Sequence, residues 1–331
     1  MKHFRGAIFI AIVGLVLAFY VGGVSTLYVV VLLAMLEVSL SFDNAVVNAK
    51  VLETMESKWQ ERFIIFGMPI AVFGMRFLFP IVIVAIASGL GILETFTLAL
   101  DNPEKYQETL GSVEKLIFAF GGSFLLMVFL SFIFDVDRED KWITIVEESD
   151  ILLTMGKVSS IQMIISMAIG ILLMSLSTQP SIGIAYFTGV LLYSLIESLD
   201  NILSSNGVRN GLMGLLYLEV LDASFSFDGV IGAFALSSDI FIIMIGLGIG
   251  AMFVRSLTLY FVKENTLDEF KYLEHGAHYA IFALAMVMFL KIFFHVNEIM
   301  VGTLGVLFIG ASLFHSIIEN HKEKKLVKQL A

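Results

Sequence analysis

Acidic side chains recur in the same pattern in two apolar stretches of the sequence. One stretch reads Glu-Val-Ser-Leu-Ser-Phe-Asp-Asn over residues 37–44, and the other reads Asp-Ala-Ser-Phe-Ser-Phe-Asp-Gly over residues 222–229. Both fit acid-x-Ser-apolar-Ser-Phe-Asp followed by Asn or Gly. An ionised carboxylate at the centre of a bilayer costs about 2.5–3.5 kcal/mol on insertion scales, so a duplicated acidic pattern in such stretches indicates a functional site.

The side chains of this pattern are hard oxygen donors. Carboxylates, hydroxyls and amides suit Mn²⁺, Mg²⁺ or Ca²⁺, and the chain has no Cys to supply a thiolate for softer metals. The sequence therefore predicts a site for a divalent cation. Its predicted ligands are Glu37, Ser41, Asp43, Asn44, Asp222, Ser226 and Asp228.

Helical spacing divides these ligands into a centre and two flanks. Six residues of helix span about 9 Å, and we expect the two copies to run in opposite directions. Glu37 and Asp222 are then predicted to form a central site, with Asp43 towards the cytoplasm and Asp228 towards the outside. Ser, Asp and Asn side chains compete with helical hydrogen bonds, so we expect the Ser-Phe-Asp turns to be locally unwound.

Two arginines fall within the apolar segments that follow the acidic copies. Arg76 follows the first copy, Arg255 follows the second, and Glu219 lies one turn before Asp222. Five acids, with Glu219 included, against two arginines leave a formal charge of −3 in these segments. Protonation of some acids or a bound cation would restore neutrality. We interpret the arginines and Glu219 either as structural counter-charges or as a gate that stands in for the cation.

The chain of 331 residues is too apolar for a water-soluble protein. Hydrophobic residues make up 58 % of it and charged residues 15 %, with a mean hydropathy of +0.92, whereas about a quarter of the residues in soluble domains are charged. The low charge, the four Pro and the lack of Cys exclude a disordered chain, a collagen-like fibre and a disulfide scaffold. The predicted fold class is an all-α polytopic membrane protein.

Ten apolar stretches are long enough to cross a bilayer as helices. If the N-terminus is cytoplasmic, fifteen Lys and Arg fall on the cytoplasmic side and three outside. This asymmetry predicts a multi-pass protein of the cell (inner) membrane with both termini in the cytoplasm. The predicted spans are 6–22, 25–48, 63–89, 113–134, 158–178, 181–203, 211–237, 239–262, 272–292 and 298–318.

The two acidic copies lie five predicted spans apart. An odd offset turns the second copy upside down in the bilayer, so the sequence predicts two inverted repeats of about five helices. We place the boundary between residues 1–157 and 158–331. Inverted repeats are characteristic of secondary transporters, which bind their substrate where the repeats meet.

Two further polar segments are predicted on the cytoplasmic side. The acidic stretch Asp135–Asp150 is interpreted as a solvated connector, with a cation-collecting loop as the alternative. Glu274, His275 and His278 begin the ninth predicted span and are interpreted as interfacial polar residues.

Around both acidic copies the sequence resembles the TerC family of integral membrane proteins, closest to its DUF475 branch. The resemblance rests on Glu37–Val46, Arg76–Pro80, Leu221–Val230 and Arg255, and it covers about residues 25–320. It implies membership of the LysE-type transporter group and export of Mn²⁺ or a similar ion in exchange for protons. Gly229 stands where the first copy has Asn44, so the two half-sites differ chemically.

Other functions compete with this interpretation. Intramembrane aspartyl proteolysis by Asp43 and Asp228 is disfavoured because the sequence has neither Gly-x-Gly-Asp nor Pro-Ala-Leu, so we expect no enzyme. Export of a cationic organic solute and a membrane-assembly role without transport remain alternatives. The expected partners are a divalent ion and the lipid bilayer, with homo-oligomerisation left open. No basic patch resembles a nucleic-acid footprint, and no organic cofactor is expected.

Overall fold

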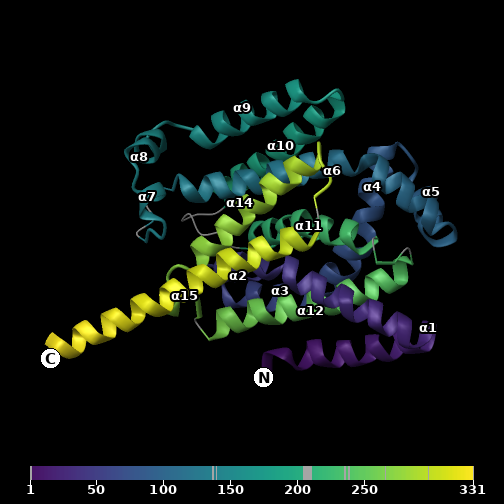
Figure 1. Cartoon of the computed structure of the whole chain (residues 1–331), viewed down its shortest axis with the longest axis horizontal. Helices are drawn as coiled ribbons and strands as arrows, with labels where there is room; N and C mark the ends of the chain where they lie inside the picture. Colours follow the sequence, from purple (N-terminus) through teal and green to yellow (C-terminus); the bar gives the residue numbers. More distant parts are fainter. Residues whose placement is uncertain are drawn as a thin grey trace.

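The structure is a computed structural model that describes residues 2–135, 138, 140–203, 211–234, 236–237, 239–264, 266–296 and 298–330. Within these ranges the regular elements are helices and no strand occurs, in agreement with the predicted all-α class (Figure 1). The helices, in chain order, are η1 (Lys2–Phe4), α1 (Arg5–Leu40), α2 (Phe42–Glu53), α3 (Ser57–Pro69), η2 (Ile70–Leu78), α4 (Phe79–Ser88), α5 (Ile92–Asp101), α6 (Pro103–Ile133), α7 (Thr144–Glu147), α8 (Asp150–Gly156), α9 (Ile161–Leu176), α10 (Pro180–Leu203), α11 (Gly211–Phe234), α12 (Ile240–Lys263), α13 (Thr266–Glu269), α14 (Leu273–Lys291) and α15 (Glu298–Leu330).

Among the described residues, six helices are long and apolar enough to cross a membrane. They are α1, α6, α12 and α14, with Pro180–Leu199 of α10 and Thr303–Lys322 of α15. Two bent pairs raise the number to eight, one joining η2 and α4 to α5 at 117° and the other joining α8 to α9 at 103°. These helices are compatible with membrane insertion. The ten predicted spans exceed these eight for two reasons. The first two predicted spans fall largely within the single helix α1, and α11, which contains three acids, is not among the six.

The long helix α1 turns back on itself in its middle. Gly23 has φ 67° and ψ −150°, a backbone conformation essentially restricted to glycine. A Cβ at Gly14 would lie 2.9 Å from Ile249, and a Cβ at Gly246 would lie 2.4 Å from Leu33. Gly14 and Leu33 would be about 28 Å apart along a straight helix. Because both contact neighbouring residues of α12, the two segments of α1 pack side by side on that helix.

This close packing predicts that Gly246→Ala destabilises the protein. The new Cβ would force α1 and α12 apart at Leu33, and overpacking of this kind costs about 1–3 kcal/mol. Thermal unfolding in detergent should show a lower midpoint for this variant. Gly111→Ala is the matched control, since nothing lies within 4 Å of its Cβ position. Equal midpoints for the two variants would contradict the prediction.

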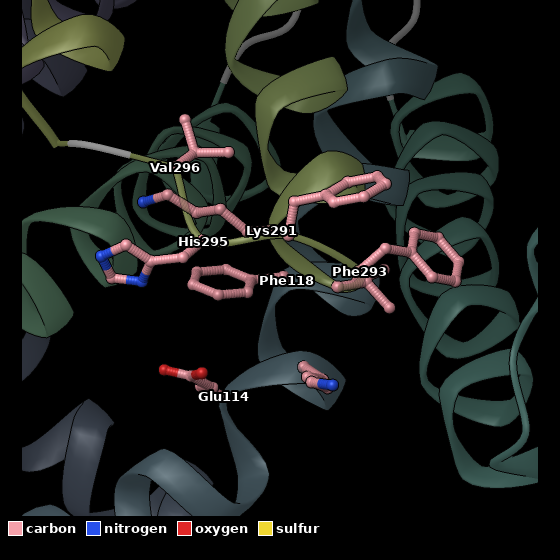
Figure 2. Close-up of a pocket in the computed structure, with 9 residues that line it drawn as sticks. Glu114, Phe118, Lys291, Phe293, His295 and Val296 are labelled. Carbon is pink, nitrogen blue, oxygen red and sulfur yellow. The ribbon is translucent and has the colours of Figure 1, made fainter.

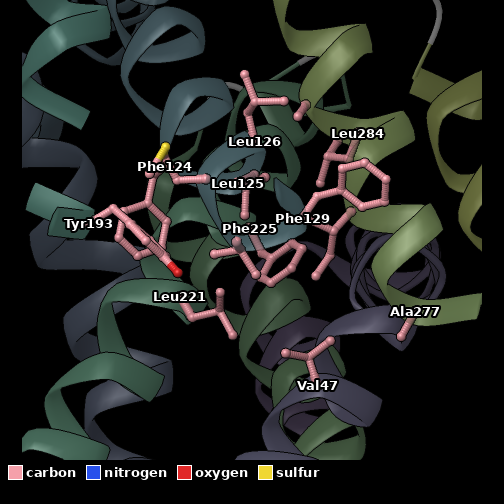
Figure 3. Packing of buried hydrophobic residues seen from close by; sticks show 14 of the residues in the cluster. Val47, Phe124, Leu125, Leu126, Phe129, Tyr193, Leu221, Phe225, Ala277 and Leu284 are labelled. Atoms are coloured by element: carbon pink, nitrogen blue, oxygen red, sulfur yellow. The ribbon is translucent and has the colours of Figure 1, made fainter. Parts of the chain in front are cut away.

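Helix α6 forms the centre of the main hydrophobic core. Phe124 contacts Tyr193 of α10, and Phe129 stacks on Phe282 of α14 with ring centroids 4.5 Å apart. Figure 3 shows side chains of α6, α10, α11 and α14 converging in this core. Helix α6 packs against helices that precede residue 157 in the chain and against helices that follow it, so the two predicted halves share one core. The boundary at that residue stays a prediction.

The acidic stretch is anchored through a buried carboxylate. Glu147 is 1 % exposed, and its Oε2 lies 2.6 Å from Arg138 Nη2 and 3.6 Å from His275 Nε2. Tyr279 donates its hydroxyl to Glu147 Oε1 at 3.2 Å. Glu147 therefore fits neither a solvated connector nor a cation-collecting loop, because its charge is used to attach the stretch to α14. His275 is likewise buried, with its Nε2 atom 2.9 Å from Asp140 O.

We expect Glu147→Gln to loosen this attachment. Removing one charge of a buried pair leaves Arg138 uncompensated, which typically costs about 3–5 kcal/mol. Limited proteolysis of the stretch and the thermal unfolding midpoint should both report the loss. Glu148→Gln serves as the neighbouring control, because that side chain is exposed. A variant at position 147 that behaves like the one at 148 would rule out the anchoring role.

Candidate cation site

Glu37 is buried at the end of α1, where the helix is interrupted. Ser41, between α1 and α2, has non-helical backbone angles (φ −110°, ψ 16°) and donates its hydroxyl to Glu37 Oε1 at 2.8 Å. Arg76, in the π-helical segment η2, donates to the same oxygen. The break predicted for the first acidic copy is thus present at Ser41. The prediction of a break in the second copy is wrong, because α11 is helical throughout that copy.

Asp222 of α11 is held by two amides of α2. Asn44 Nδ2 and Asn48 Nδ2 donate to Asp222 Oδ1 at 2.6 and 2.8 Å. All three side chains are buried. Asn48 was not among the predicted ligands, although its spacing of four residues from Asn44 places both amides on one face of α2. Hydrogen bonds to a charged acceptor are the stronger kind, so this cluster ties the two acidic copies together.

The contacts between the two copies are reciprocal. Asn44 of the first copy bonds to Asp222, the first acid of the second copy. Conversely, Glu37 lies against Gly229, which is the counterpart of Asn44, and a Cβ there would be 3.1 Å from Glu37 Oε2. Positions early in one copy therefore meet positions late in the other, so the two segments run in opposite directions where they touch. The longer acid faces glycine and the shorter acid faces asparagine, which keeps the two contacts similar in size.

A second buried acid–arginine pair lies beside this cluster. Arg255 Nη2 of α12 is 3.5 Å from Glu219 Oε1 of α11. The Arg255 guanidinium also lies 3.9 Å from the ring centroid of Phe63 in α3, a cation–π contact. Arg255 also has electrostatic interactions with Asp222 and Arg76. Both predicted arginines thus lie at buried acids, Arg76 at Glu37 and Arg255 at Glu219, one turn before Asp222.

Both arginines line one small cavity. It offers about 10 Å³ to the centre of a water molecule, roughly the room for one water. Four acceptor oxygens of the cluster have no hydrogen-bond donor among the described residues, namely Glu37 Oε2, Asn44 Oδ1, Asn48 Oδ1 and Glu219 Oε2. The cavity is lined by Asn44, Asn48, Phe63, Arg76, Asp222, Ala251, Val254, Arg255 and Thr258.

Asp43, another predicted ligand, does not line this cavity. Asp43 is buried at the start of α2, in the first turn of the helix. The side chains of Ser226 and Asp228 lie outside the described part of the structure. Glu37 and Asp222 were predicted to form a central site. Arg76 binds Glu37 and also lines the cavity at which Asp222 lies.

The arrangement is not a preformed metal site. Among the described side chains, no three Asp, Glu or His converge in a way that could hold a metal ion. The oxygens that suit a hard cation are present, but in this conformation the two guanidinium groups take part of the negative charge. A cation would have to replace at least one of these acid–arginine contacts.

A larger cavity of about 230 Å³ opens where α6 and α14 lie near Phe118 and Lys291 (Figure 2). Its single acid, Glu114, faces a lining that includes Lys115, Lys291 and His295. Three basic side chains against one carboxylate do not suit a divalent cation. The acid–amide–arginine cluster therefore remains the better candidate for cation binding.

Fold and cluster together define an all-helical protein with membrane-compatible apolar helices and a buried group of acids, amides and arginines between them. A family model described as a protein of unknown function (DUF475) matches residues 42–323, so the chain belongs to the DUF475 family. The matched range includes Asn44, Asn48 and Asp222 and begins after Glu37. No curated protein and no solved structure matches the chain.

The two amide hydrogen bonds to Asp222 predict that Asn48→Leu destabilises the protein. The buried carboxylate loses one of its two amide donors, at a cost of about 1–3 kcal/mol. The thermal unfolding midpoint in detergent measures this loss. Ser39→Ala is the control, because that exposed hydroxyl bonds only to Met35 O of its own helix. In an Asp222→Asn background, Asn48→Leu should lower the unfolding midpoint by less. An equal decrease in both backgrounds would show that Asn48 does not act through Asp222.

Proposed function

We propose that the chain is a secondary transporter for a hard divalent cation, with Mn²⁺ as its substrate. The observation that carries this proposal is the reciprocal contact of Glu37 with Gly229 and of Asp222 with Asn44. It brings oxygen donors of two oppositely running segments together between apolar helices. Transporters built from inverted repeats bind their substrates in such a place.

The charge of the cluster fits a divalent cation. Around the cluster the structure describes four buried acids, three of them at the arginines and the fourth, Asp43, at the start of α2, against two arginines, which is a formal surplus of two negative charges. One dication would balance this surplus, and the donor set of carboxylates and amides suits Mn²⁺, Mg²⁺ or Ca²⁺. The four acids are Glu37, Asp43, Glu219 and Asp222, and the two arginines are Arg76 and Arg255.

The proposed arrangement is ten spans in two inverted repeats. The six long apolar helices and two bent pairs make eight. Counting the two segments of α1 separately adds one, and α11 adds another, since its Glu219 and Asp222 face the cluster. With both termini cytoplasmic, this topology puts the two acidic copies in opposite orientations.

The proposed direction of transport and its coupling to protons rest on the resemblance to TerC-type exporters of the LysE group. We propose export from the cytoplasm across the cell (inner) membrane in exchange for protons. Export of a cationic organic solute is the second candidate, since the acids would also attract an ammonium group. The cavity of about 10 Å³ favours an ion over a molecule of amino-acid size. We propose no enzymatic activity and no organic cofactor.

Flux into liposomes that contain a divalent-sensitive dye tests the proposal. The reconstituted full chain should conduct Mn²⁺, and Asp222→Asn should lower the flux at least tenfold, because it removes the charge at the centre of the cluster. Asp43→Asn and Asp228→Asn should also lower it. A pH gradient should drive Mn²⁺ accumulation if protons are exchanged.

Glu148→Gln is the control for these variants and should transport normally. Flux that is indifferent to Asp222→Asn would refute the proposal. Lysine uptake without Mn²⁺ uptake would favour the organic solute, and the absence of both in a correctly folded sample would favour an assembly role without transport.

A further inference from the structure

The two buried arginines occupy the place where a cation would be expected. Arg76 and Arg255 both line the cavity that contains Asp222, and they are only 3 % and 5 % exposed. Each is bound to a different acid, Glu37 or Glu219. In each pair one carboxylate oxygen binds the arginine, while the other has no donor among the described residues. Both carboxylates could therefore accept a cation if their arginine moved.

The charges at the cavity, more than its size, oppose simultaneous occupation. The cavity has room for about one water molecule, and both arginines line it. A divalent ion placed there would meet two like charges in a low-dielectric environment, where repulsion is strong. Binding of the ion therefore requires that at least one arginine leave its present position.

Each arginine has a structural feature that fits such a movement. Arg76 lies in the π-helical segment η2, where Phe79 N–H bonds to Gly74 O, five residues back. Conversion of a π turn to an α turn shifts the hydrogen-bond register by one residue and rotates the side chains that follow. The Arg255 guanidinium lies 3.9 Å from the centroid of the Phe63 ring. A planar guanidinium can shift over an aromatic face and keep its cation–π contact while it leaves its acid.

We propose that Arg76 and Arg255 are built-in substitutes for the transported cation, which release their acids when the ion binds and return to them when it leaves. This inference rests on the proposed cation transport. It assigns the arginines a competitive role, because the arginines and the ion would bind the same two carboxylates. A purely structural counter-charge would instead stay in place and would be needed in both states.

Binding of Mn²⁺ to the detergent-solubilised full chain, followed through the electron paramagnetic resonance signal of the free ion, tests this competition. Arg76→Ala should bind Mn²⁺ about tenfold more tightly than the unmodified chain, because the competitor is gone. Guanidinium chloride at a non-denaturing concentration should then weaken Mn²⁺ binding to Arg76→Ala at least threefold, whereas NaCl at the same ionic strength should not. Arg76→Lys, which retains a charge, should bind Mn²⁺ much as the unmodified chain does.

Arg255→Ala provides a second, independent variant in case Arg76→Ala does not fold, and the same pattern is expected for it. Lys291→Ala is the matched control, since it removes a buried cation that lines a different cavity, and guanidinium should not affect its Mn²⁺ binding. In liposomes, the alanine variants should turn over more slowly despite tighter binding, because the empty carrier has lost its internal cation.

Weaker or unchanged Mn²⁺ binding in folded Arg76→Ala and Arg255→Ala, or a guanidinium effect no larger than that of NaCl, would overturn the inference. Either result would leave the proposed function standing, provided that Asp222→Asn still abolishes binding. If the unmodified chain does not bind Mn²⁺, the proposed function fails, and this inference fails with it.

Discussion

The buried carboxylates must find donors inside an apolar helical bundle, and the rest of the structure follows from how they do so. Asp222 takes two amide N–H groups from α2, and Glu37 takes a guanidinium and a hydroxyl. Leaving either acid charged and unpaired would cost more than a typical protein can tolerate. These bonds therefore determine which helices must lie next to one another.

The glycines of α12 and the interruption in α1 make this arrangement sterically feasible. A Cβ at Gly250 would lie 2.5 Å from Glu37 Cβ, so only glycine allows α12 to pass that close to the acid. The turn at Gly23 folds the first segment of α1 onto the same helix. Small residues of this kind allow helix backbones to approach closely in membranes. Helix α6, buried among α10, α11 and α14, supplies the apolar body that supports the cluster.

The two acidic copies are similar without being equivalent. Glu37 reaches across to Gly229, while the shorter Asp222 is met by Asn44. The first copy is interrupted at Ser41 and followed by a π-helical segment, whereas the second is a continuous helix. A pair of segments with the same pattern can therefore hold two different local conformations.

The sequence by itself determined the helical class, the membrane character and the duplicated acidic pattern, because these depend on composition and on residue order along the chain. It also pointed to Arg76 and Arg255, since isolated charges in apolar segments stand out. Only the tertiary structure decided the partners: that Asn48 holds Asp222, that Arg76 binds Glu37, and that Glu147 is buried against α14. Hydrogen-bond partners far apart in the chain depend on how helices rotate and pack against each other. Helical periodicity tells which residues share a face but not which helix that face meets.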